Sequence, residues 1–227
     1  MSALELFPAG ALARYPSVRE LAPRDIEPES FRVIADELTA RGIVVPPDRQ
    51  AVVFRAIHAS ADFDYAESLV FSPGALDAAR DVLSRRPVIV TDTNMARAGI
   101  SAASCARLGI ETCCFMADDD VAEASLRSGL TRAACAVDKA ARLFAAGGRP
   151  VLFACGNAPT ALVRLRQLHD AGFFSPAFVV GVPVGFVNVA AAKELVLRSG
   201  LPYIVACGRK GGSSVAAAIV NALLALA

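Results

Sequence analysis

The chain has 227 residues, of which 55% are hydrophobic, 7% aromatic and 20% charged, and its formal net charge is +1. This length suits one large α/β domain and is short for two of them. A net charge near zero gives no field that would attract nucleic acid. We therefore expect no nucleic-acid partner. Apolar runs such as Val151–Ala154 fall far below the roughly 18 residues of a transmembrane helix, so we expect no membrane partner either.

The six cysteines form no C-x-x-C pair, and most of them lie in apolar runs, where a reduced cysteine behaves as a small hydrophobe. We therefore expect no structural zinc, no other metal and no disulfide framework. Near its start the chain carries Glu5 and no basic segment followed by a small-residue cleavage site. This pattern predicts that there is no signal peptide and that the protein is cytoplasmic.

The first 25 residues contain Pro8, Pro16 and Pro23 without sustained periodicity, which predicts an arm lying over the domain or over a partner subunit. A helix over Phe31–Arg41 follows, with Ser30 as its N-cap. A second helix is predicted from Pro46 to about His58. The short apolar piece Leu69–Phe71 then leads to a third helix, which starts at Ser72-Pro73 and runs through Leu83.

From Pro87 onward, apolar strands alternate with helices. This alternation implies right-handed crossovers and a parallel sheet covered on both faces. We predict a three-layer, doubly wound, flavodoxin-like α/β fold with a five-stranded parallel sheet, and a single domain over residues 1–227 with residues 1–25 as its arm. The strands are expected at Val88–Thr91, Thr112–Met116, Val151–Ala154, Ala177–Val182 and Tyr203–Cys207. The helices between and after them are expected at Ala102–Leu108, Val121–Arg127, Arg132–Ala146, Pro159–Ala171, Val189–Arg198 and Ser214–Leu226.

Four turns follow the ends of predicted strands, and the carboxyl ends of parallel strands share one edge of a sheet, where they can line a single crevice. The turns are Thr91–Met95, Cys155–Thr160, Pro183–Phe186 and Cys207–Ser214. The last three contain glycine, which lets backbone approach a ligand, and each precedes a helix N-terminus, which favours anions.

The turn after Cys207 resembles a phosphate loop in composition, but its lysine precedes the second glycine, so it is not a Walker loop. No G-x-G-x-x-G follows the first strand of the alternating region, which argues against dinucleotide binding. Arg209 and Lys210, followed by backbone donors, suit carboxylates or phosphates. The alternative is a tight turn with solvated charges.

The chain has two histidines, so few groups can act as an acid or base near neutral pH. His58 follows Arg55 by three residues, which places both on one helix face. Arg55 could bind an anion while His58 offers a proton, or His58 could be a capping, structural histidine. His169 near a helix end indicates a favourable cation at the helix dipole. A nucleophilic role for Cys155 or Cys207 would require a neighbouring base.

Several ordered motifs from Ile26 to the C-terminus resemble the precorrin-8X methylmutase family of cobalamin biosynthesis. These motifs are Ile26 with Ser30-Phe31, Arg55-x-x-His58, Val70–Pro73, Thr91-Asp92-x-x-Met95 with Gly99-Ile100, Thr131-Arg132, Gly156–Leu162, Pro183–Val187 and Gly208–Ser213. Motifs of four to seven residues at compatible spacing are more specific than any one glycine turn.

The resemblance implies an isomerase that moves a methyl group between adjacent ring-C carbons of precorrin-8X, giving hydrogenobyrinate, or of its cobalt form, giving cobyrinate. It implies no dissociable cofactor, a homodimer and hand-off to other enzymes of the pathway. His58 matches the catalytic histidine, which would protonate the macrocycle. We expect substrate contacts from Ser30, Arg55, Thr93, Met95, Arg132, Asn157, Thr160, Gly185, Phe186, Arg209, Lys210, Gly211, Gly212 and Ser213.

The residues agree with this expectation, because a polycarboxylate needs cations and backbone donors while a broad ring needs apolar surfaces such as Met95 and Phe186. Two other hypotheses stay open. One is a non-catalytic corrinoid-binding or carrier protein, which would need no acid such as His58. The other is an unrelated flavodoxin-like enzyme acting on a phosphorylated metabolite, which would carry no coloured ligand.

Overall fold

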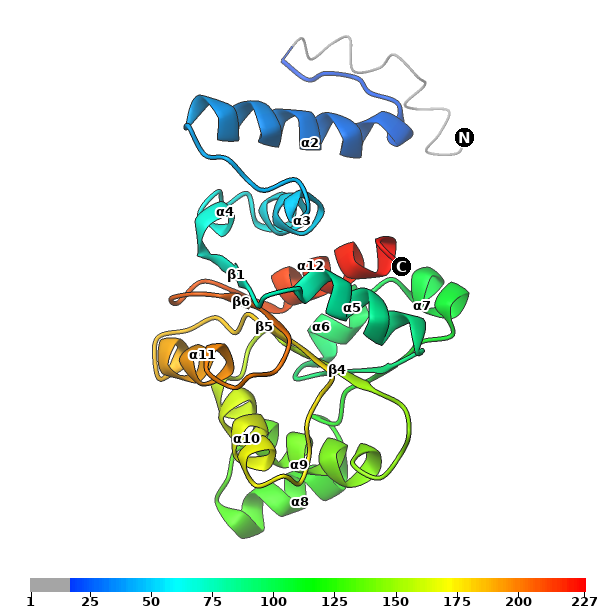
Figure 1. Ribbon diagram of the computed structural model, residues 1–227, viewed down its shortest axis with the longest axis vertical. Coiled ribbons are helices and arrows are strands. Elements are labelled where there is room, and N and C mark those ends of the chain that lie inside the picture. Colours follow the sequence, from blue (N-terminus) through cyan, green and yellow to red (C-terminus); the bar gives the residue numbers. More distant parts are fainter. Residues whose placement is uncertain (1–16) are drawn as a thin grey trace, which may run out of the picture. The chain divides into compact units, whose positions relative to one another are not determined.

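The computed structural model describes residues 17–227 (Figure 1). Its internal contacts divide the chain into two units, Met1–Ile43 and Val44–Ala227. Most of the predicted arm, residues 1–16, lies outside the described residues. Among residues 17–227, no helix combines the length and the apolar composition needed to cross a bilayer.

The first unit contains helix α2 (Pro23–Ala40). The helix begins earlier than predicted, because Pro23 fits the first helical turn, where a missing N–H costs nothing. The prediction of Ser30 as an N-cap is therefore wrong. Ser30 lies inside α2, and its hydroxyl donates to the carbonyl oxygen of Ile26 at 2.8 Å. Pro28 also lies inside the helix, near its start, at the loss of a single backbone hydrogen bond.

The second unit is an α/β structure built on a six-stranded mixed sheet with the order β1-β6-β5-β4-β2-β3. Strands β2 to β6 pair in parallel, and β1 pairs antiparallel with β6. The predicted α/β class is confirmed, but the predicted five-stranded, all-parallel sheet is wrong. The strands are β1 (Leu69–Phe71), β2 (Val88–Thr91), β3 (Glu111–Cys113), β4 (Val151–Cys155), β5 (Phe178–Gly181) and β6 (Tyr203–Ala206).

Helices cover both faces of this sheet. In Figure 1, α5, α6, α7 and α12 lie on one side, and α9, α10 and α11 lie on the other. α3, which carries two of the candidate site residues, packs on α12. The helices are α3 (Gln50–Ser60), α4 (Tyr65–Ser68), α5 (Ala75–Ser84), α6 (Asn94–Gly99), α7 (Ala102–Leu108), α8 (Asp119–Ser128), α9 (Arg132–Phe144), α10 (Pro159–Asp170), α11 (Val189–Leu197) and α12 (Ser213–Ala225).

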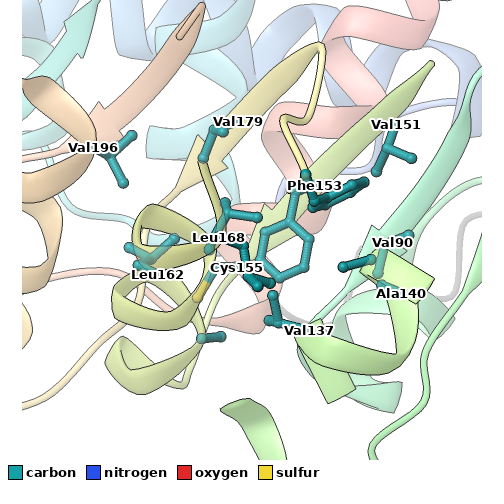
Figure 2. Close-up of a cluster of buried hydrophobic side chains, with 14 of the residues drawn as sticks. Val90, Val137, Ala140, Val151, Phe153, Cys155, Leu162, Leu168, Val179 and Val196 are labelled. Carbon is teal, nitrogen blue, oxygen red and sulfur yellow. The ribbon is translucent and has the colours of Figure 1, made fainter. Parts of the chain in front are cut away.

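The central strands are buried on both faces, as their continuous apolar sequences predict. Every residue of β2, β4 and β5 is buried. Side chains alternate between the faces, so Phe153 and Cys155 of β4 lie with Val90 and Val179 in the cluster that α9 and α10 cover (Figure 2). Close packing on both sides fixes where each strand ends, and with it the positions of the turns that follow.

Candidate active site

The turns after β2, β4, β5 and β6 lie at one edge of the sheet, because these strands run parallel. The antiparallel strand β1 begins at the same edge, with Leu69 opposite Ala206. The N–H of Cys207 donates to the carbonyl oxygen of Ser68 at 2.8 Å. The segment that leads from α3 through α4 into β1 therefore reaches the same edge as the four predicted turns.

The turn after β4 holds a carboxylate from the protein itself. Asp92, which follows β2 and is 2% exposed, accepts from the N–H groups of Gly156, Asn157 and Ala158 at 2.9, 2.8 and 2.7 Å. The thiol of Cys155 also donates to Asp92, at 3.4 Å. The sequence predicts an anion-binding turn here, and in the structure the group that this turn binds is the side-chain carboxylate of Asp92. These three N–H groups are thus not available to a substrate.

Two further turns meet beside this one. The hydroxyls of Thr93 and Ser213 share a hydrogen bond of 2.8 Å, which links the turn after β2 to the start of α12. The backbone of Gly156 lies so close to Ser213 that an added Cβ would fall 2.7 Å from the Cα of Ser213. The structure therefore brings three predicted site segments, those containing Thr93, Asn157 and Ser213, into direct contact.

The turn from Gly208 to Ser213 lies against the end of β5. The N–H of Gly212 donates to the carbonyl oxygen of Val182 at 2.9 Å, and the N–H of Gly185 donates to that of Arg209 at 3.1 Å. Only glycine fits at position 211, since a Cβ there would fall 2.0 Å from the oxygen of Val182. The predicted residues Gly185, Arg209, Gly211 and Gly212 form one continuous backbone surface.

Lys210 joins this turn to the segment after α3. Its ammonium contacts the carboxylates of Asp62 at 2.7 Å and Asp64 at 2.5 Å, and both partners raise the pKa of Lys210. The hydrogen bond from Lys210 lowers the pKa of Asp62. These contacts tie the segment that follows α3 to this edge of the sheet, with His58 four residues before Asp62.

Arg55 and His58 both lie on α3 outside its buried stripe, which consists of Val52, Val53, Ala56 and Ile57. Arg55 is half-buried and His58 is exposed. Their spacing of three residues places them on neighbouring positions of one helix face. A half-buried cation and an exposed imidazole on one helix face can bind a carboxylate and transfer a proton close to it.

Large apolar side chains are exposed at the same edge. The loop after β5 exposes Val184, Phe186 and Val187, and Phe186 is 83% exposed. Met95, at the start of α6, is 73% exposed. The guanidinium of Arg209 lies 5.6 Å from the ring centroid of Phe186. Exposed apolar surface rimmed by charge is typical of a binding surface for a large, partly apolar ligand or for another protein.

A hollow of about 290 Å³ lies where α9 and α10 begin. Its lining includes Thr131 and Thr160, whose hydroxyls share a hydrogen bond of 2.8 Å. Arg132, exposed, is the first residue of α9, directly after its N-cap Thr131. This hollow is at the lower limit of small-molecule sites, so it suits a substituent of a large ligand rather than the whole of one.

The remaining candidates are Ser30, His169, Cys155 and Cys207. Ser30 belongs to the first unit. His169 bridges Ser175 Oγ at 2.7 Å and the carbonyl oxygen of Ser199 at 3.1 Å, in loops that precede β5 and β6, which agrees with the structural role expected for it. Burial raises the pKa of the Cys155 thiol and of the Cys207 thiol, which argues against a thiolate nucleophile at either position. Among residues 17–227, no cluster of three or more His, Cys, Asp or Glu side chains has a metal-binding arrangement.

Two residues at this edge are absent from the predicted site. One is Asp92, and the other is Lys193 of α11, which is 1% exposed and donates to the carbonyl oxygens of Gly208 and Lys210. The sequence did contain a signal for Lys193. Val189, Ala192 and Val196 form the buried stripe of α11, and a residue four after Val189 lies on that same stripe.

Comparison with known proteins identifies the family of proteins that shares this fold and this sequence. The family model described as precorrin-8X methylmutase matches residues 25–226. The chain is 44% identical over 205 residues to the cobalt-precorrin-8 methylmutase of Salmonella typhimurium, with 89% of this chain and 94% of that protein covered. It is 38% identical over 197 residues to the precorrin-8X methylmutase of Pseudomonas aeruginosa, covering 86% and 91%.

A solved structure gives the same result. The precorrin-8X methylmutase of Thermus thermophilus superposes with a TM-score of 0.78 at 35% identity, covering 89% of this chain and 96% of that one. The chain is an enzyme of the isomerase class, a methylmutase. It belongs to the precorrin-8X methylmutase family, as its motifs indicate.

Proposed function

We propose that this methylmutase moves a methyl group between adjacent ring-C carbons of precorrin-8X, or of cobalt-precorrin-8, with His58 as the general acid. Substrate and product are isomers, so the proton that His58 gives to the macrocycle returns once the methyl group has moved. Protonation withdraws electron density from the conjugated ring and lowers the barrier to the shift. The relatives named above act, by their names, on these two forms of the substrate.

One observation carries this proposal. The contacts of Lys210 with Asp62 and Asp64 bring the end of α3, where His58 lies, to the turn that carries Arg209. A potential acid, His58, and a cation that can bind a carboxylate, Arg209, thus come from two different segments to one edge of the sheet. The exposed side chains of Phe186 and Met95 offer apolar contact to the ring. A site of this composition fits a large, flat ligand with acidic substituents.

If Arg55 and Arg209 bind carboxylates of the macrocycle, replacing either with leucine should weaken binding of hydrogenobyrinate. We expect a loss of about 1.5–3 kcal/mol for each, which is roughly 10-fold to 150-fold in the dissociation constant. Titration of the product, followed by visible absorbance, measures this. Arg80→Leu is the control, because Arg80 pairs with Asp77 at the surface of α5. Equal, small effects at all three positions would exclude both arginines from the binding site.

We also propose a homodimer, in which the proline-punctuated arm of residues 1–25 packs on the partner, and hand-off of product to other enzymes of the pathway. The loop after β5 exposes apolar side chains, and exposed apolar surface of this kind is typical of a contact with another protein chain. Light scattering at micromolar concentration should give the mass of two chains. A mass of one chain, 23.6 kDa, would contradict the dimer.

A further inference from the structure

The backbone around Arg209 is held from inside the protein by a buried lysine. Lys193 is 1% exposed, and its ammonium donates to the carbonyl oxygen of Gly208 at 2.9 Å and to that of Lys210 at 2.8 Å. These two carbonyl groups belong to the residues on either side of Arg209. Lys193 therefore turns both flanking peptide groups inward.

A third contact holds Arg209 itself. Its carbonyl oxygen accepts from the N–H of Gly185, and its exposed side chain lies over the ring of Phe186. The backbone at 208, 209 and 210 is thus fixed at three consecutive carbonyl groups. With the backbone fixed, the side chain of Arg209 starts from one defined point at this edge of the sheet, which lowers the entropy lost when its guanidinium binds a carboxylate.

Burying the ammonium of Lys193 carries an electrostatic cost. Burial lowers the pKa of Lys193 to about 8, from an ordinary value of 10.5, so its charged form is disfavoured in the folded chain. The folded pKa is the lower one, so the unfolded chain binds more protons between pH 8 and 10.5, and this cost to stability is relieved as pH rises through that range. An apolar side chain would avoid the cost but leave the oxygens of Gly208 and Lys210 without a donor.

We propose that Lys193 is a positioning residue that acts through Arg209. By holding the carbonyl groups on both sides of Arg209, it presents the guanidinium to a carboxylate of the substrate. The inference rests on the proposed function, in which Arg209 binds that carboxylate.

A double-mutant cycle tests this directly, with hydrogenobyrinate as the ligand. Lys193→Met keeps the length of the side chain and removes its donors, and we expect it to weaken binding about tenfold. Arg209→Leu should weaken binding at least as much. The double variant should bind like Arg209→Leu alone, because Lys193 has nothing left to position. The control is Lys139→Met, since Lys139 pairs with Asp118 and Asp120 on another part of the surface.

The same variant has a kinetic signature that a general loss of stability would not produce. Lys193→Met should raise KM about tenfold and change kcat less than threefold, because His58 lies on a different element. If Lys193→Met does not fold, Lys193→Gln, which keeps two N–H donors, takes its place in the cycle.

Additive losses in the double variant would overturn the positioning role while leaving Arg209 in the binding site. Unchanged binding by Arg209→Leu alone would instead refute that part of the proposed function.

Discussion

His58→Ala should lower kcat by about 10²-fold to 10⁴-fold, the usual contribution of a general acid. Binding of hydrogenobyrinate should stay within a few-fold of the wild type, because affinity for a polycarboxylate is distributed over several cations and apolar contacts. His58 is exposed near the end of α3 and outside its buried stripe, so its loss should leave the fold intact. Turnover assays with precorrin-8X and a melting curve measure the two effects separately.

The second histidine provides a matched control. His169→Ala removes hydrogen bonds to Ser175 and Ser199, so it should lower the free energy of unfolding by about 1–3 kcal/mol. Its kcat should remain that of the wild type, since His169 lies near the end of α10 and its partners lie in the loops before β5 and β6, away from the carboxyl ends of these strands. Near-normal isomerisation by His58→Ala, or an equal loss of turnover in both variants, would remove His58 from the mechanism.

Asp92→Asn should destabilise the protein more than any surface substitution. The carboxylate accepts three backbone N–H groups, from Gly156, Asn157 and Ala158, and an asparagine would turn an NH₂ group toward at least one of them. Each buried donor left without an acceptor costs about 1–3 kcal/mol. We expect a loss of about 2–6 kcal/mol in the free energy of unfolding, measured in urea.

An aspartate-to-asparagine substitution at an exposed position separates the loss of the buried hydrogen bonds from the effect of removing a negative charge. The side chain of Asp77 is 86% exposed and pairs with Arg80, so Asp77→Asn should change stability by no more than about 0.5 kcal/mol. Comparable unfolding midpoints for the two variants would show that Asp92 does not hold the turn after β4.

The sequence predicted the parallel strands and most helices well, because each central strand is a continuous apolar run and each helix has its own stripe. Val88–Thr91 is reproduced residue for residue, and Ala102–Leu108 likewise. The missed strand Leu69–Phe71 has three residues and exists through its pairing with β6, a partner more than 130 positions away. Ser30 was misplaced because a local capping preference was outweighed by Pro23, which starts the helix earlier.

The candidate site shows the same limit. The sequence motifs predicted the turns that contain Thr93, Asn157 and Arg209 as parts of the site, and the sheet topology places these turns at one edge. Sequence patterns do not show which polar groups are already paired inside the protein. The N–H groups of the turn after β4 are taken by Asp92, and the ammonium of Lys210 is taken by Asp62 and Asp64. Such pairings depend on contacts between segments far apart in sequence.

The proposed isomerase activity is tested by conversion of the substrate with the purified protein. Precorrin-8X and cobalt-precorrin-8 are each incubated with the wild-type protein, and absorbance, mass and the methyl resonances of the product are recorded. We expect at least one precursor to give a product of unchanged mass with a new visible spectrum and one methyl group on the neighbouring ring-C carbon. Binding of both pigments with no change in spectrum or methyl position would contradict it and indicate a carrier.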